Sequence, residues 1–229
     1  MFYEKIKLKI ELEKRVARKD RYDTQGIVEG ETEPGSQGRV LKNLISVKRK
    51  REMDLLEYQA LIEITNNSFE HYDQSFRFTA SEICKLHENW LGDIYSWAGS
   101  YRQVNMSKGS FLFAAAHLIP SLMNHFEKKV LKKYTPCHFK NNDEIIEAIA
   151  IVHNEFILIH PFREGNGRIG RLLATIMAVQ AGLPPLDFGG IKGKKKLEYF
   201  RAVQEGLSNY EPMKKIFESI VKRTLRINH

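Results

Sequence analysis

The nearly continuous apolar stretch EIIEAIAIVHNEFILI, residues 144–159, constrains the fold more than any other feature. Apolar side chains lie on every side of a helix with this sequence, so we expect it to be buried at the centre of a domain. Pro161 ends the helix, because proline has no backbone N–H and disfavours helical geometry at the residue before it. The sequence therefore predicts a fold built around this one helix.

Most other segments repeat apolar residues at helical spacing. We expect further helices within residues 40–64 (with a break near Val47), 79–99, 117–134, 171–182, 196–206 and 211–225. Thr79, followed three residues later by Glu82, has the form of a capping box. Residues 100–113 change to alternating spacing with a turn at Ser107 to Gly109, which predicts a short hairpin. The predicted fold class is therefore all-α with one small β-hairpin.

Composition limits the partners and the compartment. The 229 residues are 42% hydrophobic and 28% charged, and no apolar run approaches the roughly 18 residues needed to cross a bilayer. The N-terminus does not read as a secretory signal, and two cysteines, Cys84 and Cys137, do not suggest a disulfide framework. We expect a cytoplasmic protein with no membrane partner. The net charge of +8 favours an anionic partner, but the basic clusters are scattered and lack interleaved aromatics, so we expect no nucleic-acid partner.

The stretch HPFREGNGRIGR, residues 160–171, follows the buried helix directly and mixes residue types that a core helix does not need. REGNG reads as a loop pressed against the N-terminus of the next helix, which begins around residues 167–169. Unpaired N–H groups there, and glycines that permit close approach, form a phosphate cradle. Arg168 and Arg171 lie on one face of that helix and could clamp further phosphate oxygens. Glu164 is a hard oxygen ligand suited to Mg²⁺, and His160 can act as a general base.

Each of these features has an ordinary structural explanation when it occurs alone. A lone histidine is commonly a core residue, GNG is commonly a turn, and paired arginines are commonly surface charge. Together within twelve residues after a buried helix, they favour a site for attack on a nucleotide phosphate.

The stretch resembles the signature of the Fic (filamentation induced by cAMP) family, His-Pro-Phe-x-[Asp/Glu]-Gly-Asn-Gly-Arg-x-x-Arg, at every specified position. The resemblance extends over roughly Val40 to Ile220. It implies an N-terminal extension at 1–38 and a Fic domain at 39–229 with its core at about 80–190. It also implies a protein adenylyltransferase, which transfers AMP from Mg-ATP to a Ser, Thr or Tyr hydroxyl of a target protein.

The resemblance also implies a role for each matching residue. His160 would take the hydroxyl proton, Glu164 would hold Mg²⁺, and Phe162 would anchor the loop in the core. The residues implied to bind the nucleotide are Gly165, Asn166 and Gly167 around the α- and β-phosphates, Arg168 on the β-phosphate side, and Arg171 at the γ-phosphate. The hairpin, called the flap, would dock the target through Arg102, Val104, Asn105, Met106, Ser107 and Lys108.

Two alternatives remain open at this point. The enzyme could use another nucleotide or phospho-donor, or the chain could be a catalytically silent Fic-like binding module. Many Fic proteins are inhibited by a helix of form [Ser/Thr]-x-x-x-Glu-[Gly/Asn]. Glu29 and Gly30 match it only in part, because Gln25 stands where the hydroxyl residue should be. If Glu29 is inhibitory it should pair with Arg171; otherwise we expect an antitoxin-like partner, or no inhibition.

Overall fold

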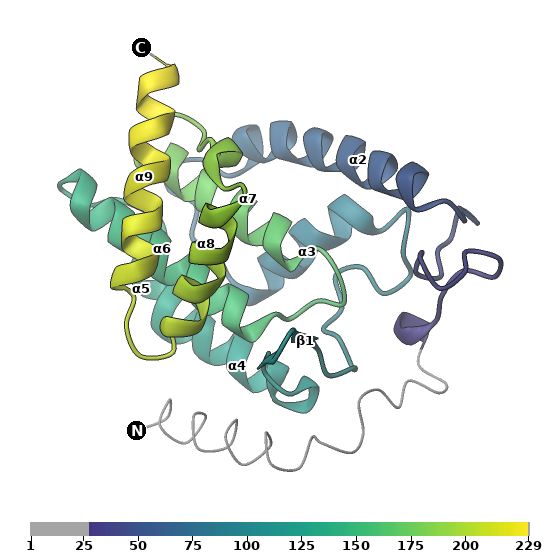
Figure 1. Cartoon of the computed structure of the whole chain (residues 1–229). Coiled ribbons are helices and arrows are strands. Elements are labelled where there is room, and N and C mark those ends of the chain that lie inside the picture. Colours follow the sequence, from purple (N-terminus) through teal and green to yellow (C-terminus); the bar gives the residue numbers. More distant parts are fainter. Residues whose placement is uncertain (1–27, 229) are drawn as a thin grey trace.

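The computed structural model describes residues 28–228 and confirms the predicted fold class, a helical domain with one two-stranded sheet. Helix α6 (Asn142–Ile159) occupies the middle of the molecule (Figure 1). It packs against α7 (Asn166–Gln180), α9 (Glu211–Ile227), α4 (Ile119–Phe126) and α8 (Lys194–Glu205). Within the described chain, no helix is both long and apolar enough to cross a membrane.

The remaining elements surround this centre. Helices α2 (Lys50–His71) and α3 (Ala80–Leu91) pack against each other and against α7. The flap is the antiparallel pair β1 (Ser107–Lys108) and β2 (Phe111–Leu112). The helical path from 116 to 134 comprises η2 (Ala116–Leu118), α4, the π-helical turn η3 (Glu127–Leu131) and α5 (Lys132–Tyr134). Short 3₁₀ turns lie at η1 (Val28–Gly30) and η4 (Phe188–Gly190).

The central helix forms where its sequence predicts it. The Asn141 side chain caps its N-terminus by accepting a hydrogen bond from the Glu144 N–H at 3.0 Å. Every residue from 148 to 159 is buried, as the all-round apolar sequence predicts. The helix ends at His160, which adopts the left-handed conformation (φ 53°, ψ 59°). This termination fixes where the histidine lies relative to the loop that follows.

Two predicted helices differ from the observed ones. Residues 40–49 are not helical, and α2 continues past residue 64 to His71. The Asn43 side chain holds the non-helical segment in a turn, because it accepts from the Val47 N–H and donates to the carbonyls of Leu41 and Val47. Helix α3 is capped by Thr79 as predicted but ends at Leu91, so residues 92–99 form turns instead of further helix.

The hairpin is shorter than predicted. Residues 101–106 are not strands, although their side chains alternate in the sequence. Their backbone groups bind side chains instead of a neighbouring strand: the N–H groups of Gln103 and Val104 donate to the Glu29 carboxylate, and the Val104 carbonyl accepts from Arg102. Only Ser107↔Leu112 and Lys108↔Phe111 pair as strand residues.

Candidate active site

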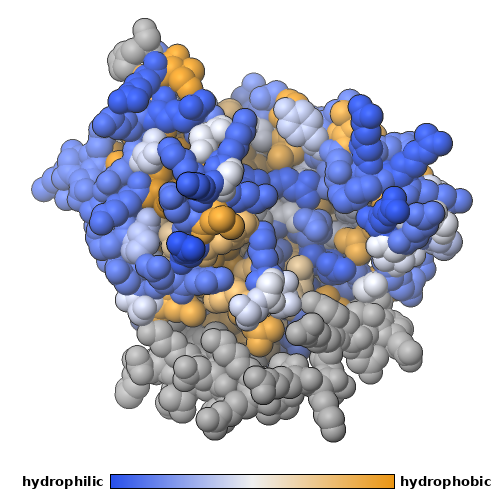
Figure 2. Space-filling view, in the orientation of Figure 1, coloured by the Kyte–Doolittle hydropathy of each residue, from blue (hydrophilic) through white to orange (hydrophobic). Residues whose placement is uncertain are grey.

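A cleft of about 1420 Å³ lies between the flap, the C-terminal end of α6, the start of α7, the η4 turn and α8. His160, Glu164, the three loop residues Gly165–Gly167, and Arg171 all line it. In the space-filling view, apolar surface (orange) gathers near the middle of the face, where α8 and the flap lie, between hydrophilic flanks (Figure 2). The structure therefore brings most of the predicted site residues to one cavity.

His160 sits in the cleft with its ring fixed on two sides. The ring stacks on Phe113 from the flap side, with centroids 3.7 Å apart and planes 13° apart. Its Nδ1 lies 3.2 Å from the Ile157 carbonyl oxygen, and since a carbonyl only accepts, Nδ1 carries the proton. Burial, with the positive charges of Arg102 and Lys108, lowers the pKa of His160 to about 3. The imidazole is therefore neutral near pH 7, with Nε2 free to accept a proton.

The loop between α6 and α7 is closed by its own side chains. Asn166 accepts from the Phe162 N–H at 2.9 Å and donates to the Phe162 carbonyl at 2.7 Å. Phe162 is fully buried and stacks on His87 at 3.9 Å, which confirms its predicted anchoring role. His87 Nδ1 accepts from the Gly99 N–H, so its Nε2 carries the proton and donates to the Glu164 carbonyl at 3.1 Å.

Gly165 has no substitute at its position. Its φ is +81°, and an added Cβ would lie 2.5 Å from the Trp90 ring. The absence of a side chain lets the loop backbone rest on that ring. The sequence predicted that glycine would let the backbone approach a phosphate. The structure adds a second reason for glycine at this position, which is the close approach of the backbone to the Trp90 ring.

The N-terminus of α7 presents donors to the cleft. The N–H groups of Arg168 and Ile169 donate to the Gly165 carbonyl, whereas those of Asn166 and Gly167 have no acceptor among residues 28–228. Arg171, one turn further along the helix, lines the same cleft. Free N–H groups and a guanidinium on one wall form a site for an anion.

Arg171 has no carboxylate partner in the described part of the chain. Its pKa is lowered by burial, while the Tyr199 hydroxyl opposes the shift and Arg168 adds to it. A half-buried guanidinium facing a cavity without a counter-ion is costly unless an anion binds there. Arg171 is therefore suited to bind an anion that enters the cleft.

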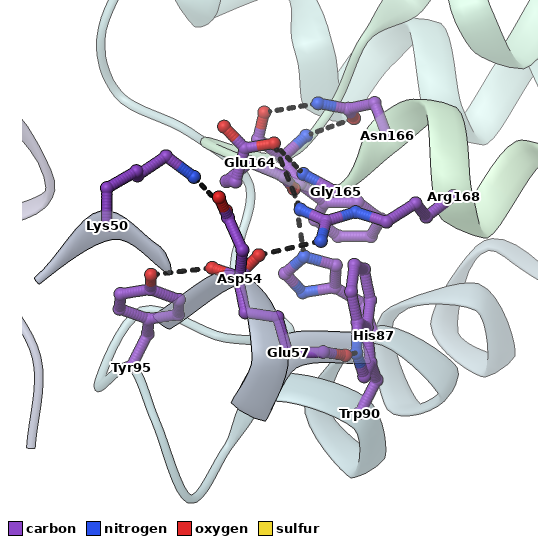
Figure 3. Close-up of polar contacts among 11 residues, drawn as sticks. Lys50, Asp54, Glu57, His87, Trp90, Tyr95, Glu164, Gly165, Asn166 and Arg168 are labelled. Carbon is purple, nitrogen blue, oxygen red and sulfur yellow. Dashed lines mark hydrogen bonds and ion pairs between the residues drawn. The ribbon is translucent and has the colours of Figure 1, made fainter. Parts of the chain in front are cut away.

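Arg168 is held by two carboxylates beside the cleft (Figure 3). Its Nη1 lies 2.6 Å from Glu57 Oε2 of α2, and its Nη2 lies 3.3 Å from Glu164 Oε1. Its guanidinium carbon lies 4.5 Å from the centroid of the Trp90 ring. Glu164 Oε1 also accepts from the Gly165 N–H at 2.9 Å. Arg168 is not among the residues that line the cleft, unlike Arg171.

The predicted flap residues divide into two groups. Arg102 and Val104, which were expected to dock a target, are buried at 1% and 6% exposure, so their side chains are not available at the surface. The Arg102 guanidinium instead donates to the carbonyls of His160, Val104 and Ala114, which ties the flap to the end of α6. Asn105 accepts from the Ala116 N–H at the start of η2.

The other predicted flap residues lie at the surface. Ser107 and Lys108 are exposed in β1, and Met106 lines the cleft. The Lys108 Nζ lies 3.5 Å from the centroid of the Phe200 ring of α8, so the tip of the flap reaches across the cleft. Burial and the nearby positive charge of Lys196 lower the pKa of Lys108.

Glu29 does not pair with Arg171, so the contact that an inhibitory Glu29 would make is not formed among residues 28–228. Its Oε1 accepts from the N–H groups of Gln103 (2.6 Å) and Val104 (2.8 Å), and its carbonyl accepts from Arg163 Nε (2.8 Å). The carboxylate is buried at the base of the flap and engaged by backbone donors. Gln25, which stands at the hydroxyl position of the partial inhibitory motif, lies outside the described residues.

Four residues that support the site escaped the sequence analysis: Glu57, His87, Trp90, and Arg102 in its buried role. Each lies far from the motif in sequence and touches it only through tertiary contacts. Polar residues on otherwise apolar faces, such as His87 beside Leu86 and Trp90, were the available signal. Their partners cannot be identified from a single sequence.

A divalent cation fits the donors that are present. Among residues 28–228, no three His, Cys, Asp or Glu side chains gather into a ready metal site. Mg²⁺ is commonly bound by one or two carboxylates together with substrate phosphates and water. Glu164, which lines the cleft with its side chain 47% exposed, is suited to that arrangement.

Comparison with known proteins agrees with this geometry. The Fic/DOC family model matches residues 77–178. Protein adenylyltransferase VbhT of Bartonella schoenbuchensis is 28% identical over 145 residues, which are 62% of this chain and 30% of that protein. Protein adenylyltransferase Fic of Aedes aegypti is 27% identical over 148 residues, 64% of this chain and 28% of that protein. The chain thus spans less than a third of the length of these curated relatives.

The fold agrees as well. The crystal structure of the BepC protein of Bartonella tribocorum, a VirB-translocated effector with bound AMPPNP, is similar with a TM-score of 0.63 at 24% identity. The similarity covers 79% of this chain and 91% of that one. Residues 77–178 therefore form a Fic/DOC domain.

Proposed function

We propose that this chain is a protein adenylyltransferase that transfers AMP from Mg-ATP to a Ser, Thr or Tyr hydroxyl of a target protein. The observation that carries the proposal is Arg171, which has no carboxylate partner among residues 28–228, beside the N–H groups of Asn166 and Gly167, which have no acceptor there; all three residues line one cleft. This wall is suited to a triphosphate, because backbone N–H groups and a guanidinium bind phosphate oxygens well. The curated relatives named protein adenylyltransferases support the choice of reaction.

The proposed chemistry places His160 beside the target hydroxyl. Its neutral Nε2 takes the hydroxyl proton as the hydroxyl oxygen forms a bond to the α-phosphorus. The bond between the α-phosphorus and the bridging oxygen to the β-phosphorus breaks, and pyrophosphate leaves. The Nδ1 proton, held by the Ile157 carbonyl, keeps the accepting nitrogen in the required tautomer.

Glu164 would hold Mg²⁺ bound to the phosphates, and the ion would neutralise charge that develops on the leaving pyrophosphate. In the structure the Glu164 carboxylate instead accepts from Gly165 N–H and Arg168. It must therefore rotate, or share these donors, when the nucleotide binds. Its half-exposed position permits that movement.

The target would dock along the flap. Both residues of strand β1 are exposed, and exposed strand edges bind extended segments through main-chain hydrogen bonds. Met106, Ser107 and Lys108 would contact the target, which is supported by the exposure of Ser107 and Lys108 and by the position of Met106 at the cleft.

Inhibition, where it occurs, would come from outside residues 28–228, and we propose an antitoxin-like partner as its source. With Glu29 engaged at the base of the flap, no carboxylate of the described chain pairs with Arg171. A carboxylate supplied by the partner could pair with Arg171 and displace the phosphate.

A labelling assay tests the proposed function. The protein is incubated with Mg²⁺, a cell lysate, and ATP, GTP, CTP or UTP labelled in the nucleoside, and modified proteins are identified by mass spectrometry. We expect Mg²⁺-dependent labelling from ATP, with AMP on a hydroxyl side chain. Preferential labelling from another nucleotide would replace ATP as the donor. Nucleotide binding without labelling of any protein, itself included, would favour the silent binding module.

A further inference from the structure

We propose that Glu57, on helix α2, is a positioning residue that fixes the Arg168 guanidinium for phosphate binding; this rests on the proposed function. The Glu57 carboxylate is buried, at 3% exposure. Its Oε2 lies 2.6 Å from Arg168 Nη1, and its Oε1 accepts from the Tyr95 hydroxyl at 2.7 Å (Figure 3). Both carboxylate oxygens therefore have fixed partners, as a buried charge requires.

The same residue also holds the surface beneath the arginine. The Glu57 backbone carbonyl accepts from Trp90 Nε1 at 2.9 Å, and the Arg168 guanidinium lies over that indole ring. The Trp90 ring in turn fills the space where Gly165 lacks a side chain. Glu57 therefore supports the loop twice, through its carboxylate and through its backbone.

The contacts leave Arg168 able to bind an anion. A guanidinium has five N–H groups, and the two contacts with Glu57 and Glu164 use one from each terminal nitrogen. Three N–H groups remain, and the Arg168 side chain is 25% exposed. Because its orientation is already set by Glu57 and Trp90, less conformational entropy is lost when phosphate binds.

Glu57 lies outside the family match, which begins at residue 77. Helix α2 therefore contributes to the site from a segment that the motif does not include. The opposite arrangement is also testable: a Glu57 that competed with phosphate for Arg168 would weaken nucleotide binding, and removing its charge would tighten it.

Calorimetric titration of the full chain with Mg-ATP and with AMP distinguishes these cases. We expect Glu57→Gln to weaken Mg-ATP binding about tenfold and AMP binding less than twofold, because only ATP carries the outer phosphates. In an Arg168→Ala background, Glu57→Gln should have no further effect. Glu63→Gln, an exposed position on the same helix, is the matched control and should bind both nucleotides like the wild type.

Unchanged or tighter ATP binding by Glu57→Gln would overturn the proposal. So would a loss of ATP affinity in the Arg168→Ala background as large as the loss in the wild-type background, because it would show that Glu57→Gln acts on the fold and not through Arg168. If circular dichroism shows that Glu57→Gln lowers the folded fraction, the same titrations are carried out with Glu57→Asp. This variant keeps the charge but shortens the side chain, so it should lose affinity for ATP and not for AMP. A wild-type chain that binds no Mg-ATP would contradict the proposed function itself.

Discussion

His160 is positioned by its backbone before any substrate binds. Its left-handed conformation at the end of α6, the Ile157 carbonyl at Nδ1 and the Phe113 ring hold the imidazole in one orientation. The Arg102 guanidinium binds the His160 carbonyl, so it braces the residue without touching its reactive nitrogen. As the proposed general base, His160 would therefore not need to be reoriented during the reaction.

His160→Ala should reduce target labelling by at least about a hundredfold, because general-base catalysis contributes that much or more. Binding of Mg-ATP, measured by calorimetry, should stay within about threefold, because the imidazole contacts the hydroxyl and not the phosphates. His117→Ala, an exposed histidine in η2, is the control and should label normally. Labelling by His160→Ala at a rate close to that of the wild type would remove this residue from its role.

Residues of the motif were predictable because their chemistry is adjacent in sequence. HPFREGNGRIGR contains the base, the carboxylate, the glycines and both arginines within twelve positions. The supporting residues were not predictable, because Glu57 and His87 reach the loop from positions 111 and 77 residues away. The contact that an inhibitory Glu29 would make with Arg171 is not formed within residues 28–228, because the Glu29 carboxylate binds the backbone N–H groups of Gln103 and Val104.

At the scale of elements, the flap depends on side chains that are not part of it. At the base of the flap, the Arg102 guanidinium donates to the Val104 carbonyl. The Glu29 carboxylate, which belongs to η1, accepts from the Gln103 N–H. Arg163, in the loop between α6 and α7, donates to the Glu29 carbonyl. The η1 turn therefore contacts both the flap and this loop. The orientation of the flap should therefore respond to changes in η1.

Glu29→Ala should loosen the base of the flap. The N–H groups of Gln103 and Val104 lose a charged acceptor, which typically contributes about 1.5–3 kcal/mol per hydrogen bond. We expect faster amide hydrogen exchange at these two residues, weaker target labelling and unchanged ATP binding. Glu31→Ala, which removes only a surface pair with Lys42, should change none of these. A rise in self-labelling of tenfold or more would instead return Glu29 to an inhibitory role.

Helices were predictable from periodicity, whereas their ends depended on local hydrogen bonds. The apolar spacing of α6, α7 and α9 identified them, and the Asn141 side chain caps the start of α6. Residues 40–49 are not helical because the Asn43 side chain forms hydrogen bonds with the backbone, and these bonds compete with helix formation. The flap was predicted as longer because alternation of side chains does not reveal which backbone groups are already engaged.

For the whole molecule, the buried residues His87 and His153 and the partly buried His160 govern the response to mild acid. Burial lowers the pKa of His87 to about 4, of His153 to about 4 and of His160 to about 3. In the unfolded chain these pKa values are about 6.5. Burial also raises the pKa of Glu155 to about 7, so this residue opposes them.

Near pH 5.5 the three histidines are therefore mostly protonated in the unfolded chain and neutral in the folded chain. Glu155 behaves in the opposite way: it is protonated in the folded chain and ionised in the unfolded chain. The net difference of about two protons predicts that the free energy of unfolding falls by about 2–3 kcal/mol for each pH unit below 6.5. The stabilising effect of neutral histidines is complete above pH 6.5 and is lost as the pH falls. Urea denaturation at pH 5, 6 and 7 measures this slope.

Glu155→Gln removes the opposing proton, so the slope of the variant should be steeper than that of the wild type by up to about 1.4 kcal/mol per pH unit. A wild-type stability that stays flat or rises as the pH falls from 6.5 to 5 would show that the histidines are not buried in their neutral form.

The position of the label on ATP tests the central claim most directly. The protein, Mg²⁺ and target-containing lysate are incubated in parallel with ATP labelled at the α-phosphate and ATP labelled at the γ-phosphate, with His160→Ala as the inactive control. Adenylyl transfer predicts that protein retains the α-label, that the γ-label leaves with pyrophosphate, and that the control retains neither. Retention of the γ-label on protein would show phosphoryl transfer and contradict the account.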